Sequence, residues 1–534
     1  MIVNLEQDEK PEFAADVCIV GAGAAGLVLA AELVRQGRRV LLLESGGAKL
    51  EPAVQELNAC SYSGQPRRLA HMGRFRALGG TTTMWGGQIL ELTEGDFAVR
   101  AWVPGSGWPI TKVSLQPYYE RALVAEGLAA VERSDEEIWR QMKTEIPPLG
   151  DALENYFTRW CPEPNFGRLY SELLHSSNLC LVLHATVTAI VLSESGVRVQ
   201  GLRCRSLTGK EQDFSAQQYV LCLGTIETVR LLLQPISEVA APPWKQSGFL
   251  GRHFQSHIDY NAAQVPAEAA LRLRRWFANA YLNGYKYHPK FRLAFAEQKR
   301  RQILNIAGSI TCINPGEMEV RRVKKLARNF LRDQDSTPLW RELPALFRQM
   351  RTMLALSYGY WVQHRAWWPR DSAFWLRVHC EQEPTSQSHI TLTDVRDGVG
   401  LLKVKLDWQV SSLEWKTIRE FTAKARSLAA LGGTHILCQP ELEREDGFDQ
   451  IVFDNSHHDM GGTRMSESPT DGVVDPNLKL HGLQNAYVCS ASVFPTGGFS
   501  NPTHTLIALA IRLADHLVNR LCGVDESGKE IADA

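Results

Sequence analysis

The sequence lacks several features that would place a chain in a specialised class of protein. Its 534 residues contain 58 Lys and Arg against 59 Asp and Glu, a net charge of −1. No excess of one sign therefore points to nucleic acid or to an anionic surface as a partner. Hydrophobic residues make up 44% and charged residues 22%. These values are typical of globular proteins and exclude a disordered chain, a coiled coil or a collagen-like fibre.

Clustered cysteines are also absent. The eleven Cys are scattered, and no two have C-x-x-C spacing, so neither a zinc site nor an iron–sulfur centre has local support. An odd number of unclustered Cys indicates reduced thiols in a cytosol-like compartment. The first residues, MIVNLEQDEKPEF, show neither the basic nor the apolar region of an export signal. We therefore expect a cytoplasmic protein.

Long hydrophobic runs and internal repeats are missing as well. The apolar interval from Val17 to Ala31 is too short to span a bilayer and contains three Gly. Asp16 and Glu32 flank it. We predict no membrane span. With 534 residues, the chain has room for three to four domains at about 150 residues each.

What is present is a nucleotide-binding pattern at residues 16–44. A short apolar strand at 16–20 precedes Gly21-Ala-Gly23-Ala-Ala-Gly26, which opens a helix through Arg35, and a second strand at 40–43 ends at Glu44. Gly21 suits the tight turn, Gly23 the approach of a pyrophosphate, and Gly26 close packing of helix and strand. The helix N-terminus favours phosphate, and Glu44 can accept from ribose hydroxyls. The pattern does not decide between NAD and FAD.

Further segments predict a discontinuous α/β fold. Residues 181–187, 219–224 and 485–489 are strand-like, and residues 226–233 and 503–521 are helical. Between 259 and 451, alternating segments such as 388–393 and 401–407 predict a mostly antiparallel sheet, interrupted by a helical stretch at 318–352. We predict an α/β protein, a Rossmann-like domain carrying an inserted α+β substrate domain.

Two more regions carry polar and glycine-rich motifs. The loop from Arg76 to Gly87 concentrates four Gly and three Thr, which suits close approach to a ligand but also a structural Ω-loop. Near the C-terminus, His457 and His458 precede a Gly-Gly turn. Asn501 directly precedes Pro502, which is an ordinary arrangement for a helix N-cap. Taken alone, His458 and Asn501 are better explained as structural residues. A metal site at the two His lacks a third ligand nearby, so we expect none.

The motifs together resemble one family. GAGAAG with its acidic residue, GGTTTMWGG, HHDMGGTRM, VVDPNLKLHGLQNAYVCSASVFP and SNPTHTLIALAIRLADHL stand in the order found in the glucose-methanol-choline (GMC) family of FAD-dependent oxidoreductases. They resemble its pyranose oxidase and bacterial sugar dehydrogenase branch most. The resemblance implies that His458 is the active-site base and Asn501 its partner above the flavin. The reaction it implies is oxidation of CH–OH, with the proton going to His458 and the hydride to flavin N5.

The resemblance also implies the cofactor site and the domain boundaries. Met84 stands where relatives with covalently attached flavin carry the linking His, so we expect non-covalent FAD. Ser490 replaces a common Asp, and Val187 and Gly224 fall near adenine. The FAD-binding domain would comprise residues 1–100, 176–258 and 452–534, and the substrate domain with its lid elements residues 101–175 and 259–451. The expected cofactor-binding residues are Gly21, Ala22, Gly23, Ala25, Gly26, Glu44, Ser45, Gly79, Gly80, Thr81, Met84, Trp85, Gly86, Val187, Gly224, Ser490, Ala491, Pro502 and Thr503.

The expected substrate is a small molecule: a sugar, glycoside or related polyol, oxidised to a ketone or an aldehyde. A sterol or other apolar alcohol, or a lyase that keeps FAD structurally, is the alternative. Aromatic residues that would suit stacking on either kind of substrate are Trp361, Trp367, Trp368 and Trp375. Oxygen, a quinone or a redox protein would accept the electrons. Basic residues on one helical face at 321–332 would suit an anionic surface, an acidic electron-acceptor protein or a membrane interface, but a solvated face is the simpler interpretation.

Overall fold

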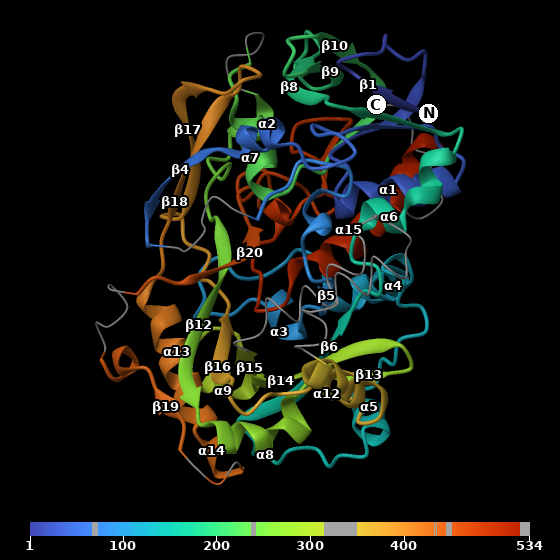
Figure 1. Ribbon diagram of the computed structural model, residues 1–534. Coiled ribbons are helices and arrows are strands. Elements are labelled where there is room, and N and C mark those ends of the chain that lie inside the picture. The colour runs from blue at the N-terminus through green and yellow to red at the C-terminus, as the bar shows by residue number, and fades with distance from the viewer. Residues whose placement is uncertain are drawn as a thin grey trace.

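The computed structural model describes residues 1–66, 73–236, 242–313, 350–431, 433, 435–444 and 451–523. Within them, the strands form four sheets. The parallel sheet and its helices occupy one end of the molecule in Figure 1, and a largely antiparallel sheet occupies the other. The N-terminus lies at the end of the parallel sheet (Figure 1).

The parallel sheet assembles segments that are distant in the sequence. Its strands, in spatial order, are β1 (Ile2–Asn4), β7 (Leu179–Leu183), β3 (Val40–Leu43), β2 (Ala15–Val20), β11 (Ala216–Leu221) and β21 (Ala486–Val488), all paired in parallel. Nearly every side chain of β2, β3 and β7 is buried, as expected for strands covered on both faces. The predicted strand–helix–strand unit at 16–44 is confirmed, with helix α1 (Ala24–Arg35) between β2 and β3.

Helices and a small sheet complete this end of the molecule. α1 packs against α15 (Pro502–Leu521), and α15 packs against α4 (Lys112–Ala125). α7 (Thr225–Leu233) follows β11 as predicted. A three-stranded sheet of β10 (Glu211–Phe214), β9 (Val199–Arg205) and β8 (Thr186–Leu192) contacts β11, where the Tyr219 hydroxyl donates to the Gln200 carbonyl at 2.8 Å.

The prediction of one strand at 181–187 is wrong. His184 has a left-handed backbone, with φ of 56°, and this turn ends β7 and sends the chain into β8 of a different sheet. The turned imidazole contacts Asn4 at 3.0 Å and Glu51 at 3.1 Å. Apolar periodicity carries no information about such a turn.

The second large sheet forms the opposite end of the molecule (Figure 1). Its central strands are β12 (Gln255–Val265), β16 (Ala373–Cys380), β15 (Ile306–Ile313), β14 (Tyr285–Leu293) and β6 (Leu153–Trp160), each antiparallel to its neighbours. Shorter strands at its margins are β5 (Gln88–Ile89), β13 (Ala280–Leu282), β19 (Leu437–Cys438) and β20 (Asp454–Met460). The helices around it are α5 (Asp135–Gln141), α8 (Ala267–Phe277), α9 (Phe295–Arg301), α12 (Met350–Trp361), α13 (Ser412–Ala425) and α14 (Ser427–Leu431).

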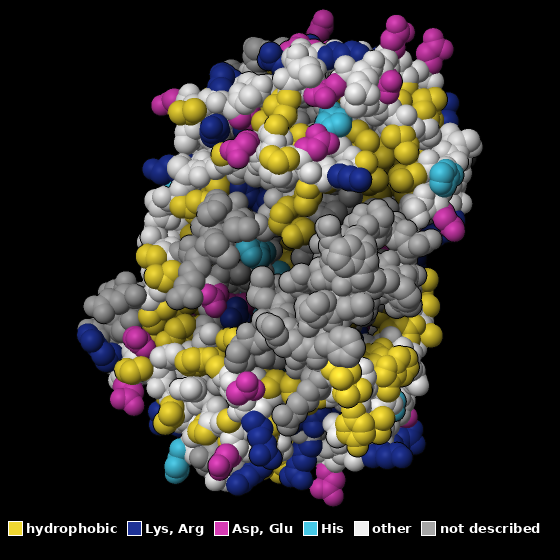
Figure 2. All heavy atoms as spheres, in the orientation of Figure 1, with side chains coloured by type: hydrophobic (Ala, Val, Ile, Leu, Met, Phe, Trp, Pro, Cys, Tyr) yellow, Lys and Arg dark blue, Asp and Glu magenta, His cyan; other side chains and the backbone are white. Residues whose placement is uncertain are grey.

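The segments predicted at 388–393 and 401–407 do form an antiparallel pair, β17 (His389–Arg396) and β18 (Leu402–Trp408). They belong to a separate sheet, however, because β18 pairs in parallel with β4 (Cys60–Gly64). The basic segment 321–332 and most of the helical stretch predicted at 318–352 lie outside the described residues; α12 begins at Met350. Figure 2 shows acidic and basic side chains interspersed over the visible face, in keeping with the balanced composition.

Candidate active site

The glycine turn after β2 has the geometry that its sequence predicts. Gly21 has φ of 103°, a backbone conformation that favours glycine. A Cβ on Gly26 would lie 1.9 Å from the Gly21 carbonyl oxygen, so only glycine lets α1 begin this close to β2. A Cβ on Gly23 would meet no protein atom within 4 Å, and this residue lines an open cleft. Gly21 therefore forms the turn, Gly26 allows the close contact between α1 and β2, and Gly23 leaves its backbone exposed to the cleft.

The cleft encloses about 1240 Å³ of empty space, including the solvent at its mouth. Both ends of the chain and the middle contribute to its wall. The predicted cofactor-binding residues that line it are Gly21, Gly23, Ala25, Glu44, Ser45, Gly80, Thr81, Trp85, Gly224, Ala491, Pro502 and Thr503. Residues separated by hundreds of positions thus meet around one elongated site.

Glu44 lies at the carboxyl end of β3, where the sequence places it. Its carboxylate accepts hydrogen bonds from the backbone N–H groups of Ala22 and Gly46, each at 2.9 Å. Burial raises the pKa of Glu44, whereas these two donors oppose the rise. The carboxylate is thereby fixed beside the glycine turn.

The loop GGTTTMWGG lies directly against the glycine turn. Gly79 donates to the Ala22 carbonyl at 2.8 Å, and a Cβ on Gly80 would approach the Gly23 Cα to 2.9 Å. Gly80, Thr81 and Trp85 of this loop form part of the cleft wall. Three predicted residues of this loop do not line the cleft: Gly79 bonds Ala22 behind it, Met84 is 62% exposed, and Gly86 packs on the Trp160 ring.

Several other predicted residues lie just behind the cleft wall. Val187 lines a small neighbouring cavity that also contains Thr186 and Leu223. Ser490 is fully buried, and its hydroxyl accepts from the Ser492 backbone N–H at 3.2 Å. Ala22 donates its backbone N–H to Glu44 and accepts from Gly79, and Gly26 allows α1 to begin close to β2.

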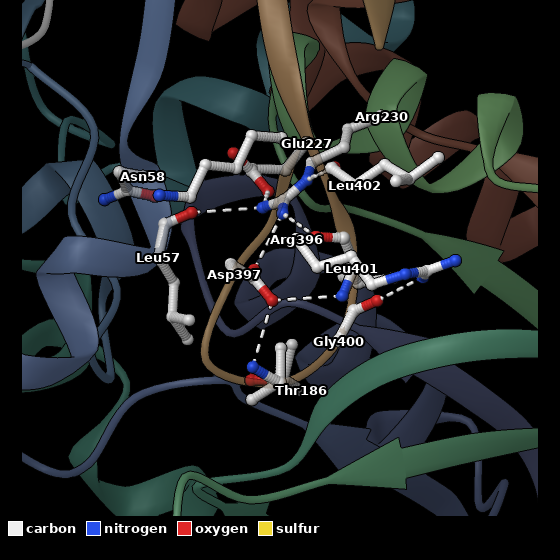
Figure 3. Close-up of polar contacts among 12 residues, drawn as sticks. Leu57, Asn58, Thr186, Glu227, Arg230, Arg396, Asp397, Gly400, Leu401 and Leu402 are labelled. Carbon is white, nitrogen blue, oxygen red and sulfur yellow. Dashed lines mark hydrogen bonds and ion pairs between the residues drawn. The ribbon is translucent and has the colours of Figure 1, made fainter. Parts of the chain in front are cut away.

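Sequence reasoning missed a charged network beside this cavity. The Glu227 carboxylate bridges Arg74 at 2.8 Å and Arg76 at 2.5 Å. Burial alone would raise the pKa of Glu227, but the surrounding guanidinium groups outweigh it and lower the pKa to about 2. Figure 3 shows the extension of this network through Arg230, which bonds the Leu57 carbonyl at 3.0 Å and Asp397 at 2.7 Å. No local motif predicts this network, because its residues come from four separate segments of the sequence.

His458 and Asn501 are brought together beside the cleft, although neither residue lines it. The Asn501 amide Nδ2 lies 3.1 Å from Nε2 of His458. Asn501 precedes α15 but makes no side-chain bond to the helix, so it is not a capping residue in this structure. The cleft wall includes the chain neighbours of both residues: His457 and Asp459 on one side, Pro502 and Thr503 on the other.

The environment of His458 keeps its imidazole neutral. Burial, followed by the proximity of His379, lowers the pKa of His458 to about 3, although Asp259 opposes the shift. A neutral imidazole has a lone pair that can accept a proton. His458 therefore has the protonation state that a general base requires.

Two further histidines, which sequence reasoning missed, surround His458. His257 on β12 places its Nδ1 3.0 Å from Nδ1 of His458. His379 on β16 has its ring centroid 5.3 Å from that of His458 and bonds Asp259 through Nδ1. One ring nitrogen from each of the three histidines lies within 4.8 Å of the others, a spacing also compatible with a metal ion. Strand pairing between distant segments creates this cluster, so no spacing in the sequence reveals it.

Residues that the sequence left undecided fall in different places. His457 lines the cleft, whereas buried His504 bonds Glu126 at 2.7 Å and stacks on Tyr119. Of the candidate aromatic residues, Trp361 is 73% exposed and Trp368 is buried. Among the described residues, no helix is both long and apolar enough to cross a bilayer.

The fold and the site define a class: an α/β protein with a cleft at the glycine turn of its parallel sheet and the His458–Asn501 pair beside it. Comparisons with known proteins extend this. Residues 384–510 match the family model described as GMC oxidoreductase, and residues 19–48 match the NAD(P)-binding Rossmann-like domain. The chain therefore carries a C-terminal region similar to that of the GMC oxidoreductases behind a Rossmann-like segment, and it is an FAD-dependent enzyme that oxidises CH–OH groups.

Relatives match over nearly the whole chain. The 6'''-hydroxyparomomycin C oxidase of Streptomyces lividus is 25% identical, over 95% of this chain and 92% of its own. The fructose dehydrogenase large subunit of Gluconobacter japonicus is 20% identical, over 95% and 98%. Among solved structures, pyridoxine 4-oxidase from Mesorbium loti has a TM-score of 0.54 and 18% identity, over 94% of this chain and 98% of its own. This structural likeness supports the fold.

Proposed function

We propose that this enzyme oxidises a hydroxyl-bearing carbon of a sugar, glycoside or related polyol to a ketone or an aldehyde. The observation that carries the proposal is the 3.1 Å contact between Asn501 and His458 beside the cleft, where burial lowers the pKa of the imidazole. Two relatives named for a paromomycin derivative and for fructose support the substrate class.

Each of the two residues has a separate task. His458 receives the hydroxyl proton at Nε2, a step in which a positioned base contributes about 10²–10⁴-fold. Asn501 donates from its amide to the substrate oxygen and so holds it near Nε2. FAD, when bound, accepts the hydride. In the cluster at His458, His257 is buried and His379 and His458 are partly buried, which limits access of water to the developing charge.

The residues present suit FAD. A Cβ on Gly23 or Gly224 would project into space free of protein atoms, so backbone is exposed where a pyrophosphate needs it. Glu44, fixed by two backbone donors, is available to ribose hydroxyls. Pro502 and Thr503 present the N-terminus of α15 to the cleft, which favours negative charge by about 0.3–1 kcal/mol when exposed.

We also propose that FAD is held without a covalent bond, because Met84 offers no imidazole nitrogen for attachment. Acid precipitation of the purified holoenzyme tests this directly. All of the yellow flavin is expected in the supernatant. Flavin that remains in the washed pellet contradicts the proposal.

The domain division remains part of this proposal. The strands of the parallel sheet come from residues 1–100, 176–258 and 452–534, which supports an FAD-binding domain built from these three segments. All eleven cysteine thiols are free, which supports function in a reducing compartment such as the cytoplasm.

An anaerobic screen tests the proposed reaction. The holoenzyme is mixed with a panel of sugars, glycosides, polyols and sterols, and flavin absorbance is followed. A sugar or polyol is expected to bleach the flavin. Bleaching by sterols alone contradicts the substrate class, and bleaching by no alcohol contradicts the reaction. Repeating the positive case with oxygen, then with a soluble quinone, identifies the electron acceptor.

A further inference from the structure

His257 lies directly behind the proposed base. It is a residue of β12, 1% exposed, and strand pairing places Ser256 opposite Asp459, so the two histidines come from adjacent strands. The two Nδ1 atoms are 3.0 Å apart. Two nitrogens at this distance share one hydrogen, with one ring donating and the other accepting.

The direction of this hydrogen bond follows from Asn501. Its amide nitrogen faces Nε2 of His458 and can only donate, so Nε2 is the accepting nitrogen. A neutral imidazole carries one N–H, which must then be on Nδ1 of His458. His257 therefore accepts this hydrogen at its own Nδ1. Burial, together with the neighbouring imidazoles, holds the pKa of His257 well below its usual range, so this ring stays an acceptor.

A carboxylate lies beside the two rings. Asp259 bonds His379 through one oxygen and accepts from Arg377 at 2.8 Å through the other. The His379 ring centroid is 4.5 Å from that of His257, so the Asp259–His379 pair flanks the contact between His257 and His458. A negative group here favours positive charge on His458.

We propose that His257 is the positioning residue of His458: it selects the tautomer in which Nε2 carries no hydrogen and can receive a proton from the substrate, and it stabilises the imidazolium that then forms. This inference rests on the proposed function. In the step, the substrate O–H bond breaks and an N–H bond forms at Nε2; the hydride from the substrate C–H bond would be accepted by FAD. Nδ1 keeps its hydrogen throughout. The bond to His257 strengthens as His458 becomes charged, so it contributes more in the transition state than before.

Two substitutions separate this role from simple packing. Asn at position 257 places its carbonyl oxygen where Nδ1 stands, so His257→Asn retains an acceptor. Phe retains the ring but has no acceptor. His257→Phe is expected to slow anaerobic flavin reduction about 10- to 100-fold, the effect of losing a hydrogen bond to a charged group. His257→Asn is expected to stay within about fivefold of wild type. A His257→Phe variant as fast as wild type, or an Asn variant as slow as Phe, overturns the proposal.

The tautomer itself is measured without turnover. In ¹⁵N-histidine-labelled protein, the resonances that disappear in His458→Asn belong to His458. A protonated Nδ1 is expected in wild type and in His257→Asn, and a shift toward protonated Nε2 in His257→Phe. Protonation at Nε2 in wild type overturns the proposal. So does one equivalent of a tightly held metal ion that is lost in His379→Ala, because the three imidazoles would then be its ligands.

Failure of the inference about His257 is distinguishable from failure of the proposed function. Wild type that is reduced by an alcohol, a slow His458→Ala variant and an unaffected His257→Phe variant together reject the inference alone. FAD content and thermal unfolding of each variant identify any that fails to fold. In that case the wild-type tautomer and the His257→Asn rate still decide the question.

Discussion

The carboxamide of Asn501 points to Nε2 of His458, 3.1 Å away, and makes no bond to the helix that it precedes. This arrangement assigns the side chain to the site and not to the stability of α15. The contribution of Asn501 to the reaction rate can therefore be measured separately from any effect of helix capping on stability.

Asn501→Ala is expected to slow flavin reduction by about 10²-fold, as removal of a positioned donor does, with little change in thermal stability. Ser411→Ala is the matched control, because Ser411 caps α13 by accepting from Leu413 at 3.1 Å. That variant is expected to lose about 1 kcal/mol of stability and keep its rate. An Asn501→Ala variant that loses stability but not rate contradicts the assignment.

The glycines of the turn make a second matched pair. In Gly23→Ala the new methyl meets no protein atom, so apoprotein stability should be unchanged while FAD affinity falls. In Gly26→Ala the methyl collides with the Gly21 carbonyl oxygen, and a loss of about 1–3 kcal/mol is expected. FAD titration and urea unfolding of the apoproteins measure both effects. Equal destabilisation by the two substitutions is inconsistent with this division of roles.

A buried ion pair links the loop before α4 to the residue that directly follows β16, the strand that carries His379. Arg100 and Glu381 are 1% and 0% exposed at their side chains and lie 2.5 Å apart. Arg100→Met leaves an unpaired buried carboxylate and is expected to cost about 3–5 kcal/mol. Adding Glu381→Gln removes that charge and keeps an acceptor for the Asn305 N–H, so much of the stability should return. Chemical denaturation provides the test, and a double variant no more stable than Arg100→Met contradicts it.

The pH dependence follows from the depressed pKa of His458, about 3. An ordinary histidine, with a pKa near 6.5, would be almost fully protonated at about pH 5 and unable to accept a proton. Here the reduction rate with an uncharged substrate should change little from about pH 8 to 5. A fall centred near pH 6.5 would show that His458 titrates normally.

The lowered pKa of His458 also affects the free energy of unfolding. Since the folded-state pKa lies below the unfolded value, the unfolded chain binds the extra proton first. The contribution of neutral His458 to stability is therefore present above about pH 6.5 and lost as pH falls toward 3. His458→Asn should remove part of the acid destabilisation between these limits, measured by denaturation at several pH values. An unchanged pH dependence of unfolding contradicts this.

Local patterns sufficed for part of this structure. The strand–turn–helix unit at 16–44 depends on neighbouring residues, and so do the helices α7 and α15. The family resemblance, rather than periodicity, identified His458 and Asn501 as members of one site. By contrast, His257 meets His458 across 201 positions and Asp259 meets His379 across 120, through pairing of β12 with β20 and β16. Arg76 and Glu227 likewise meet only after the parallel sheet has formed. One sequence contains no signal for such pairings.

The most direct test of the account is the single-turnover rate of flavin reduction, measured anaerobically with the best substrate from the screen, in wild type and in His458→Ala. The account predicts a rate lower by about 10²–10⁴-fold in the variant, with FAD still bound in full. A loss under about tenfold, with intact FAD content, would remove His458 from the mechanism and contradict the account.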